Sequence, residues 1–142
     1  MILNKIKKTT LVLITILSLT ILSGCSKEEV VSNEEFKNIS TSELQSNLDN
    51  DSWVIVDTRI NDAYNGWALD GVSRGGHILN AVDFSANWLK VENKDKEETL
   101  EKALETKGIN KDKNIVLYDS NGTDAKEVAN YLHKKGYENL YI

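Results

Sequence analysis

Residues 114–124 read NIVLYDSNGTD, and they carry the clearest fold signal in the chain. Its first half, NIVLY, is a short apolar run bounded by polar residues, which is typical of a buried β-strand. The turn DSNGT follows, and Asp124–Lys135 then carries apolar residues at helical spacing up to Gly136, a residue that commonly ends a helix. A buried strand that leads through a tight turn into an amphipathic helix indicates a parallel α/β unit.

The sequence on both sides continues the alternation of strand and helix. Ser40 and Glu43 have the spacing of a capping box, which predicts that a helix begins beside them. Because strands separated by helices pair in parallel through right-handed crossovers, we predict a three-layer α/β domain with a central parallel sheet. The other predicted elements are strands at Trp53–Val56, Ala81–Asp83 and Asn139–Ile142, helices at Thr41–Leu48 and Lys94–Lys107, and one helical turn near Ala63 and Tyr64.

The N-terminus has the features of a secretory signal. Lys5, Lys7 and Lys8 precede Thr9–Leu22, an uncharged apolar run of 14 residues. A transmembrane helix is the alternative, but a bilayer needs roughly 20 such residues. A basic segment, a short apolar segment and small residues at the cleavage site predict a signal peptide over residues 1–24.

The cleavage region resembles the bacterial lipobox. Leu22, Ser23, Gly24 and Cys25 stand directly after the apolar run, and Cys25 is the sole cysteine of the chain. The resemblance implies that Cys25 is lipidated and becomes the first mature residue; a chance cysteine in an ordinary signal is the alternative. Two acyl chains suffice for stable attachment, so the expected location is the extracytoplasmic face of the bacterial cell membrane. The acidic residues 25–36 then form a tether.

Composition excludes several classes of function. Removing residues 1–24 leaves 14 basic and 22 acidic residues and a formal net charge of −8, which argues against a nucleic-acid partner. One cysteine excludes an internal disulfide and a cysteine-based metal cage, and no metal or cofactor is predicted. We interpret Trp53, Trp67 and Trp88 as core or rim packing rather than a ligand-stacking box.

Three motifs occur in order along the chain: WVIVDTR at Trp53–Arg59, RGGHILNA at Arg74–Ala81, and NIVLYDSNGTD at Asn114–Asp124. Together they resemble the rhodanese family of sulfurtransferases. The resemblance implies a single rhodanese-like domain over residues 37–142, with its active loop between the strand that ends at Tyr118 and the following helix.

The resemblance also implies what this loop lacks. In active members the loop begins with a cysteine that accepts sulfane sulfur as a persulfide, and amides at the helix N-terminus stabilise the anion. Here the position is Asp119, whose carboxylate cannot carry a transferable sulfur and would itself occupy the positive cradle. Asp124 stands where active members often have a basic residue. No catalytic residue is therefore predicted, and the loop equivalent comprises Asp119, Ser120, Asn121, Gly122, Thr123 and Asp124.

The remaining motif residues are interpreted as structural. In the resembled family the equivalents of Asp57 and Arg59 tie neighbouring loops together. His77 could be a general base, but within the family motif it is structural. Leu79 and Asn80 replace the usual Pro and Gly, and Asn tolerates left-handed geometry, so the turn is expected to persist.

A second resemblance offers a rival chemistry. Asp119 and the residues after it are similar to the D-x-D-G-T nucleophile loop of haloacid-dehalogenase-type phosphatases, which would use Asp119 covalently with Mg²⁺. Such an enzyme needs a later Lys and further acids, and only 23 residues follow Asp119. We therefore favour the rhodanese resemblance.

The resemblance leaves two classes of function open. A rhodanese domain normally continues beyond a strand like Asn139–Ile142 into a Gly-rich turn and a closing helix, so the domain is expected to be incomplete at its C-terminus, with an uncovered sheet face or edge. In tandem rhodaneses a first domain with Asp at the cysteine position precedes the catalytic domain. The segment is then the non-catalytic first domain of a longer sulfurtransferase, with a second rhodanese domain in the same chain; alternatively it is a stand-alone inactive lipoprotein that binds a partner.

Overall fold

The computed structural model describes residues 36–69 and 71–142. The predicted signal peptide, the lipobox with Cys25 and all of the predicted tether except Phe36 lie outside the described residues. Within the described ranges, no helix has both the length and the apolar character needed to cross a bilayer.

A four-stranded parallel sheet forms the centre of the domain, in the order β2-β1-β3-β4. Strand β1 (Trp53–Asp57) pairs with β3 (Asn114–Tyr118) along its whole length, from Trp53 opposite Asn114 to Asp57 opposite Tyr118. The short strands β2 (Val82–Asp83) and β4 (Leu140–Tyr141) flank this pair. All pairings are parallel, as the alternation of strands and helices predicts.

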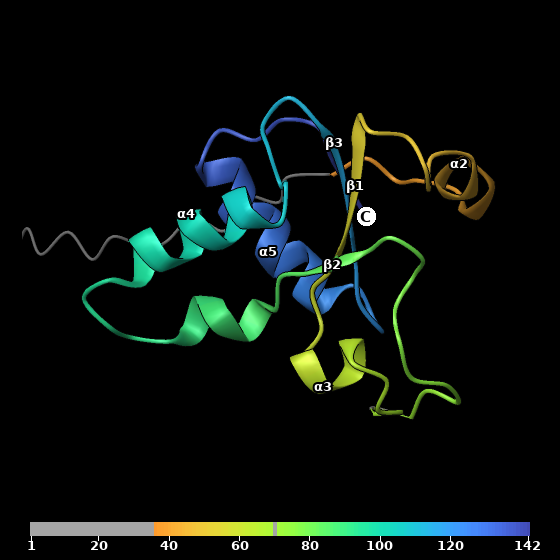
Figure 1. The fold of residues 1–142 in the computed structure, drawn as a ribbon, viewed down its shortest axis with the longest axis horizontal. Coiled ribbons are helices and arrows are strands. Elements are labelled where there is room, and N and C mark those ends of the chain that lie inside the picture. Colours follow the sequence, from red (N-terminus) through yellow and green to blue (C-terminus); the bar gives the residue numbers. More distant parts are fainter. Residues whose placement is uncertain (1–35, 70) are drawn as a thin grey trace, which may run out of the picture. The chain divides into compact units, whose positions relative to one another are not determined.

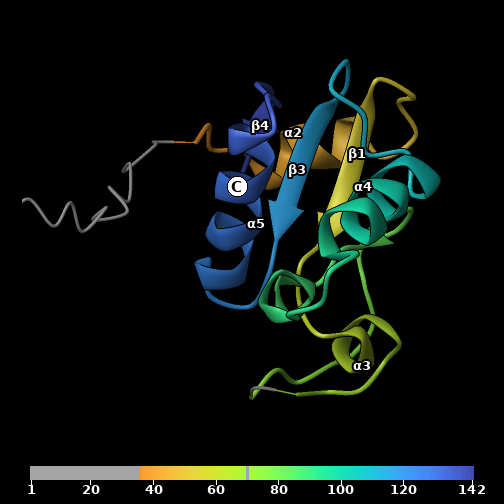
Figure 2. The ribbon, with the colours of Figure 1, turned by 90° about the vertical axis from the view of Figure 1, so that its left-hand side faces the viewer.

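Helices cover the two faces of the sheet unequally. Figures 1 and 2 show α4 (Lys96–Thr106) and α5 (Thr123–Lys134) on one face and α2 (Thr41–Ser46) on the other. The face covered by α4 and α5, called the thick face below, holds the main apolar cluster. This cluster includes Val54, Val56, Ile115, Leu117, Leu100, Leu104, Val128 and Leu132. Ile55 and Val116 alternate with these strand residues, so their side chains lie on the opposite face of the sheet. They are buried as well. Helix α2 buries no residue completely, so the second face has only a thin cover.

The edge of the sheet beside β4 is paired. The N–H of Lys37 donates to the carbonyl of Leu140 at 3.3 Å, and the N–H of Ile142 donates to the carbonyl of Lys37 at 2.9 Å. Ile39 N–H donates to the Ile142 carbonyl at 3.4 Å, and Phe36 packs against the core. Of the predicted uncovered face or edge, the edge of β4 is thus paired, because the segment after the predicted tether lies parallel to it.

The predicted elements agree closely with the structure. Strand β3 has the predicted bounds, and the helical turn near Ala63 is α3 (Asn61–Tyr64). The Ser40 hydroxyl accepts the Glu43 N–H at 3.2 Å and caps α2, which ends two residues before the predicted Leu48. Asn80 adopts φ of 62°, the left-handed geometry expected of it.

The sequence did not predict the 3₁₀ helix η1 (Ala86–Lys90), which follows β2 on the thick face. A 3₁₀ helix of five residues is too short to leave a periodic signal in the sequence. The predicted helix from Lys94 begins two residues later, at Lys96, because Asn93 and Asp95 form a turn: the Asn93 Oδ1 accepts the Asp95 N–H at 3.0 Å.

Candidate functional site

The candidate site lies at the carboxyl ends of β1 and β3, where parallel α/β domains place their chemistry. Asp57 ends β1 and Tyr118 ends β3, and these two residues are partners in the register. Figure 2 shows the β3 arrow leading into the loop before α5, with α3 beyond the same end of the sheet.

The loop after β3 is folded around the carboxylate of Asp119. Its Oδ1 accepts the N–H groups of Asn121, at 2.9 Å, and of Gly122. Its Oδ2 accepts the N–H groups of Asp124, at 2.6 Å, and of Ala125, at 3.2 Å. One side chain therefore satisfies four backbone donors at the positive end of α5.

The fifth amide of this cradle is also engaged. The N–H of Thr123 donates to the side-chain oxygen of Asn121 at 3.0 Å. Gly122 adopts φ of 83°, which turns the chain from the loop into the first residue of α5 and which favours glycine. The consecutive amides of residues 121–125 thus all point to internal acceptors.

The structure brings the six predicted loop residues together in one turn. Asp119 and Asp124 are half-buried, whereas Ser120 is exposed. Asp124 lies in the first turn of α5, so a second carboxylate stands at the helix end that favours anions. A mobile anion entering this cradle would have to displace the carboxylate of Asp119.

Another carboxylate, that of Asp57, forms a network at the adjacent carboxyl end of β1. Asp57 is fully buried, and its Oδ1 accepts the Arg59 Nε–H at 2.9 Å while its Oδ2 accepts an Arg59 Nη2–H at 2.6 Å. The Arg59 Nη2 also donates to the carbonyl of Gly76 at 2.6 Å, which ties the β1 end to the loop before β2. The ion pair thus has the bidentate geometry that suits a buried arginine.

Tyr118 also joins this network to the loop before β2. Its hydroxyl donates to Oδ2 of Asp57 at 2.8 Å and accepts the N–H of Ile78 at 3.1 Å. Burial raises the pKa of the Tyr118 phenol, and the hydrogen bond with Asp57 raises the pKa of the Arg59 guanidinium. Both shifts favour the protonated phenol and the charged guanidinium.

His77 contacts α3. Its ring stacks on Tyr64, with ring centroids 4.0 Å apart and 9° between the ring planes. Because the carbonyl of Tyr64 can only accept, the His77 Nδ1 carries the proton that is donated to it at 2.8 Å. The Tyr64 hydroxyl in turn donates to the carbonyl of Ala81 at 2.9 Å.

Gly75 of the RGGH segment is required by close backbone packing. A Cβ at this position would lie 1.9 Å from the carbonyl oxygen of Gly66 and 2.8 Å from the carbonyl carbon of Trp67. No side chain fits there unless the backbone moves. The contact fixes the loop whose Gly76 carbonyl accepts the Arg59 hydrogen bond.

The sequence motifs pointed to Asp57, Arg59, His77 and Asp119 but not to the contacts with Tyr118, Tyr64 and Ile78. Only the position of Tyr118, an aromatic residue at the polar end of a buried strand, could have drawn attention to it. The tryptophans differ from one another: Trp53 packs on Tyr141 with ring centroids 5.0 Å apart, Trp88 packs on Phe84, and Trp67 is 66% exposed. Across the described ranges, His, Asp and Glu side chains form no group of three that could hold a metal ion.

A parallel α/β domain with an amide cradle between a central strand and the following helix is a fold class built to hold an anion at that loop. Residues 40–142 match the family described as Rhodanese-like domain. The chain therefore belongs to the rhodanese-like domain family.

Solved structures agree with this assignment. The chain is similar to the anaerobic ergothioneine biosynthesis enzyme from Chlorobium limicola in complex with trimethyl histidine, at 31% identity and a TM-score of 0.66 over 75% of this chain and 24% of that chain. A structure of EanB with ergothioneine covalently linked to a persulfide cysteine matches with the same values. The chain thus spans about a quarter of the length of these structures. Comparison with curated proteins found no match.

Proposed function

We propose that this chain is the membrane-anchored, non-catalytic rhodanese-like domain of a longer sulfane-sulfur transferase. The observation that carries the proposal is the carboxylate of Asp119, which accepts four backbone N–H groups in the loop where active relatives hold their sulfur. The cradle is formed, and its occupant belongs to the protein itself.

The chemistry of position 119 supports inactivity of this segment. Sulfur transfer through a persulfide needs a thiolate that attacks the donor and a cradle of amides that stabilises the resulting anion. A structure of EanB has a persulfide cysteine, whereas residues 26–142 of this chain contain no cysteine. A carboxylate oxygen at residue 119 offers no sulfur to carry.

Two further parts of the proposal rest on the sequence and on the comparison with solved structures. Lys5 to Leu22 and the lipobox-like residues before Cys25 support lipidation of Cys25 and attachment outside the cytoplasmic membrane. The length of the similar structures, about four times that of the matched segment, supports a sulfur-transferring domain elsewhere in the whole protein.

Thiocyanate release from thiosulfate and cyanide tests the catalytic part. We expect residues 26–142 to release no more thiocyanate than the Asp119→Ser variant, and the longer protein to be active. Asp119→Cys in the same segment supplies the missing thiol. Its thiolate is expected to take the outer sulfur of thiosulfate, with release of sulfite, and so to gain the mass of one sulfur atom, which Asp119→Ser does not. Turnover by residues 26–142 that Asp119→Ser abolishes would contradict the proposal.

Membrane fractionation tests the anchor. We expect the full chain to sediment with bacterial membranes and the Cys25→Ser variant to be released after signal cleavage or to remain as an unprocessed precursor. An unchanged mass of the mature wild-type N-terminus, without acyl chains, would remove the lipoprotein part of the proposal and leave the sulfur-transfer part standing.

The second candidate is a stand-alone inactive domain that binds a partner at the membrane surface. The rigid, internally satisfied loop at residues 119–125 favours it, because such a loop has become a fixed surface rather than a reaction site. Absence of thiocyanate release from the longest natural product of the gene would favour this candidate over the first.

A further inference from the structure

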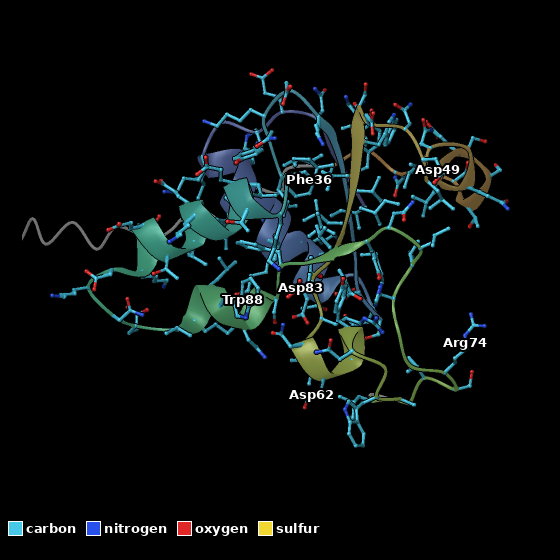
Figure 3. All side chains as sticks on the ribbon, viewed as in Figure 1. Phe36, Asp49, Asp62, Arg74, Asp83 and Trp88 are labelled. Atoms are coloured by element: carbon cyan, nitrogen blue, oxygen red, sulfur yellow. The ribbon has the colours of Figure 1, made fainter. Side chains whose placement is uncertain are left out.

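A cavity of about 350 Å³ lies between η1 and α4, away from the loops at the carboxyl ends of β1 and β3. Figure 3 shows Trp88 on η1, and Figure 1 shows η1 alongside α4 on the thick face of the domain. Trp88, Val91, Leu100 and Ala103 form its apolar lining. Its volume is at the small end of the range of ligand pockets, roughly 300–1,000 Å³.

The aromatic wall of the cavity is fixed by contacts outside it. The Trp88 indole Nε1–H donates to Oδ1 of Asn61 at 3.2 Å, and the ring packs edge-on against Phe84 with centroids 5.3 Å apart. The Lys107 ammonium lies 5.5 Å from the Trp88 ring centroid. Because the contacts with Asn61 and Phe84 already fix the indole, little side-chain freedom is lost when a ligand contacts it.

Polar side chains at the rim already have partners within the domain. Lys96 pairs with Glu92 at 3.3 Å, and Oδ1 of Asn93 accepts the Asp95 N–H at 3.0 Å. The Thr99 hydroxyl donates to the carbonyl of Asp95 at 2.9 Å. A ligand with strong hydrogen-bonding groups would therefore lose its water without finding free partners for them.

The charges beside the cavity decide the sign of its ligand. Glu97, in the first turn of α4, pairs with Lys135 at 2.5 Å, whereas Glu98 beside it is exposed. Only Lys96 at the rim is basic, and Glu92 already neutralises it. The lining therefore offers no unpaired cation to an anion such as a fatty acid carboxylate.

We propose that the cavity between η1 and α4 binds a small, uncharged apolar molecule of one or two rings, against the indole of Trp88. Apolar contact with Val91, Leu100 and Ala103 supplies the affinity, and Trp88 supplies a flat aromatic surface for the ring. Val91 is 51% exposed at the mouth, where a ligand would cover it. This site is independent of the sulfur chemistry of the loop at residues 119–124.

Photolabelling of the full chain in its membrane tests the proposal. The probe is 3-phenyl-3-(trifluoromethyl)diazirine, a neutral single-ring reagent, and labelled positions are mapped by mass spectrometry of peptides. We expect saturable labelling of the peptide that spans residues 88–103, reduced at least tenfold by excess naphthalene. Benzoate, the anionic single-ring competitor, is expected to have no effect at the same concentration.

Two variants make the labelling specific to the cavity. Ala103→Phe fills it, and Ala68→Phe adds the same side chain to an exposed loop as the matched control. We expect a tenfold loss with Ala103→Phe and no change with Ala68→Phe. If Ala103→Phe does not fold, as judged by circular dichroism, Val91→Glu at the exposed mouth is expected to give the same loss.

Other results overturn the proposal. Labelling that is uniform over the chain, or equal in Ala103→Phe and wild type, shows partition of the probe rather than binding. Light scattering that finds a dimer, with labelling of residues 88–103 only after dissociation, shows that a second copy covers the cavity instead.

Discussion

Asp57 ends strand β1, Asp119 directly follows the neighbouring strand β3, and the two carboxylates are held in opposite ways. Asp57 is fully buried and is satisfied mainly by side chains, with Arg59 and Tyr118 bonding both of its oxygens. Asp119 is half-buried and is satisfied by four backbone N–H groups of its own loop. The first carboxylate joins segments far apart in the sequence, whereas the second organises residues within six positions.

The two carboxylates therefore have different structural roles. Loss of the Asp57 network would leave a charge in the protein interior and detach the loop of residues 76–78 from the sheet. Loss of the Asp119 contacts would free the amides of one turn, which water can reach. We therefore expect the two sites to differ both in the size of their effect on stability and in how far the effect spreads.

Arg59→Ala should have the largest effect. Removing one partner of a buried ion pair leaves Asp57 uncompensated, and we expect a loss of about 3–5 kcal/mol in the free energy of unfolding. Urea denaturation followed by tryptophan fluorescence measures it. Arg74→Ala is the matched control, because Arg74 is exposed and projects from its loop in Figure 3. Equal effects of the two variants would refute the importance of the Asp57 pair.

Asp119→Ala should come second. Loss of a capping carboxylate with several backbone partners is expected to lower the free energy of unfolding by about 2 kcal/mol, and Asp119→Asn by less because one acceptor oxygen remains. Hydrogen exchange should accelerate at the amides of residues 121–125 and stay unchanged at Ile78. Faster exchange at Ile78 would show that the two carboxylate sites are coupled.

Tyr118→Phe should have the smallest effect, about 1 kcal/mol near neutral pH, since it removes one hydroxyl and leaves the Asp57–Arg59 pair. Burial raises the Tyr118 pKa above its unfolded value, so the phenol contributes stability that is complete below about pH 10 and is lost as pH rises further. The deficit of Tyr118→Phe relative to wild type should therefore shrink above about pH 10 in urea denaturation series. A deficit that is constant up to pH 11 would indicate an unperturbed phenol.

Local sequence patterns predicted the parts of the fold that depend on neighbouring residues. The run NIVLY gave β3 its full bounds, and Ser40 with Glu43 located the start of α2. The position of Asp119 before the helix was predicted for the same reason, because a helix N-terminus needs acceptors close in sequence. Asn80 was expected to tolerate the left-handed conformation that it adopts.

Contacts between distant residues were not predicted. Tyr118 bonds Asp57 across 61 positions and Ile78 across 40, and no periodicity encodes such a pairing. The pairing of Lys37–Ile39 with β4 was missed because β4 lies at the other end of the chain. The need for glycine at residue 75 depends on where the backbone of Gly66 passes, which only the folded chain determines.

The pairing of Lys37–Ile39 with β4 has a mechanical consequence. Three hydrogen bonds join this segment to residues 140 and 142, and the segment runs in the same direction as β4. A pull on the N-terminal side that acts along the strand axis loads all three bonds together in shear, so they resist as a group rather than opening one by one. A domain that is pulled at its N-terminal side can therefore bear tension without exposing the edge of its sheet.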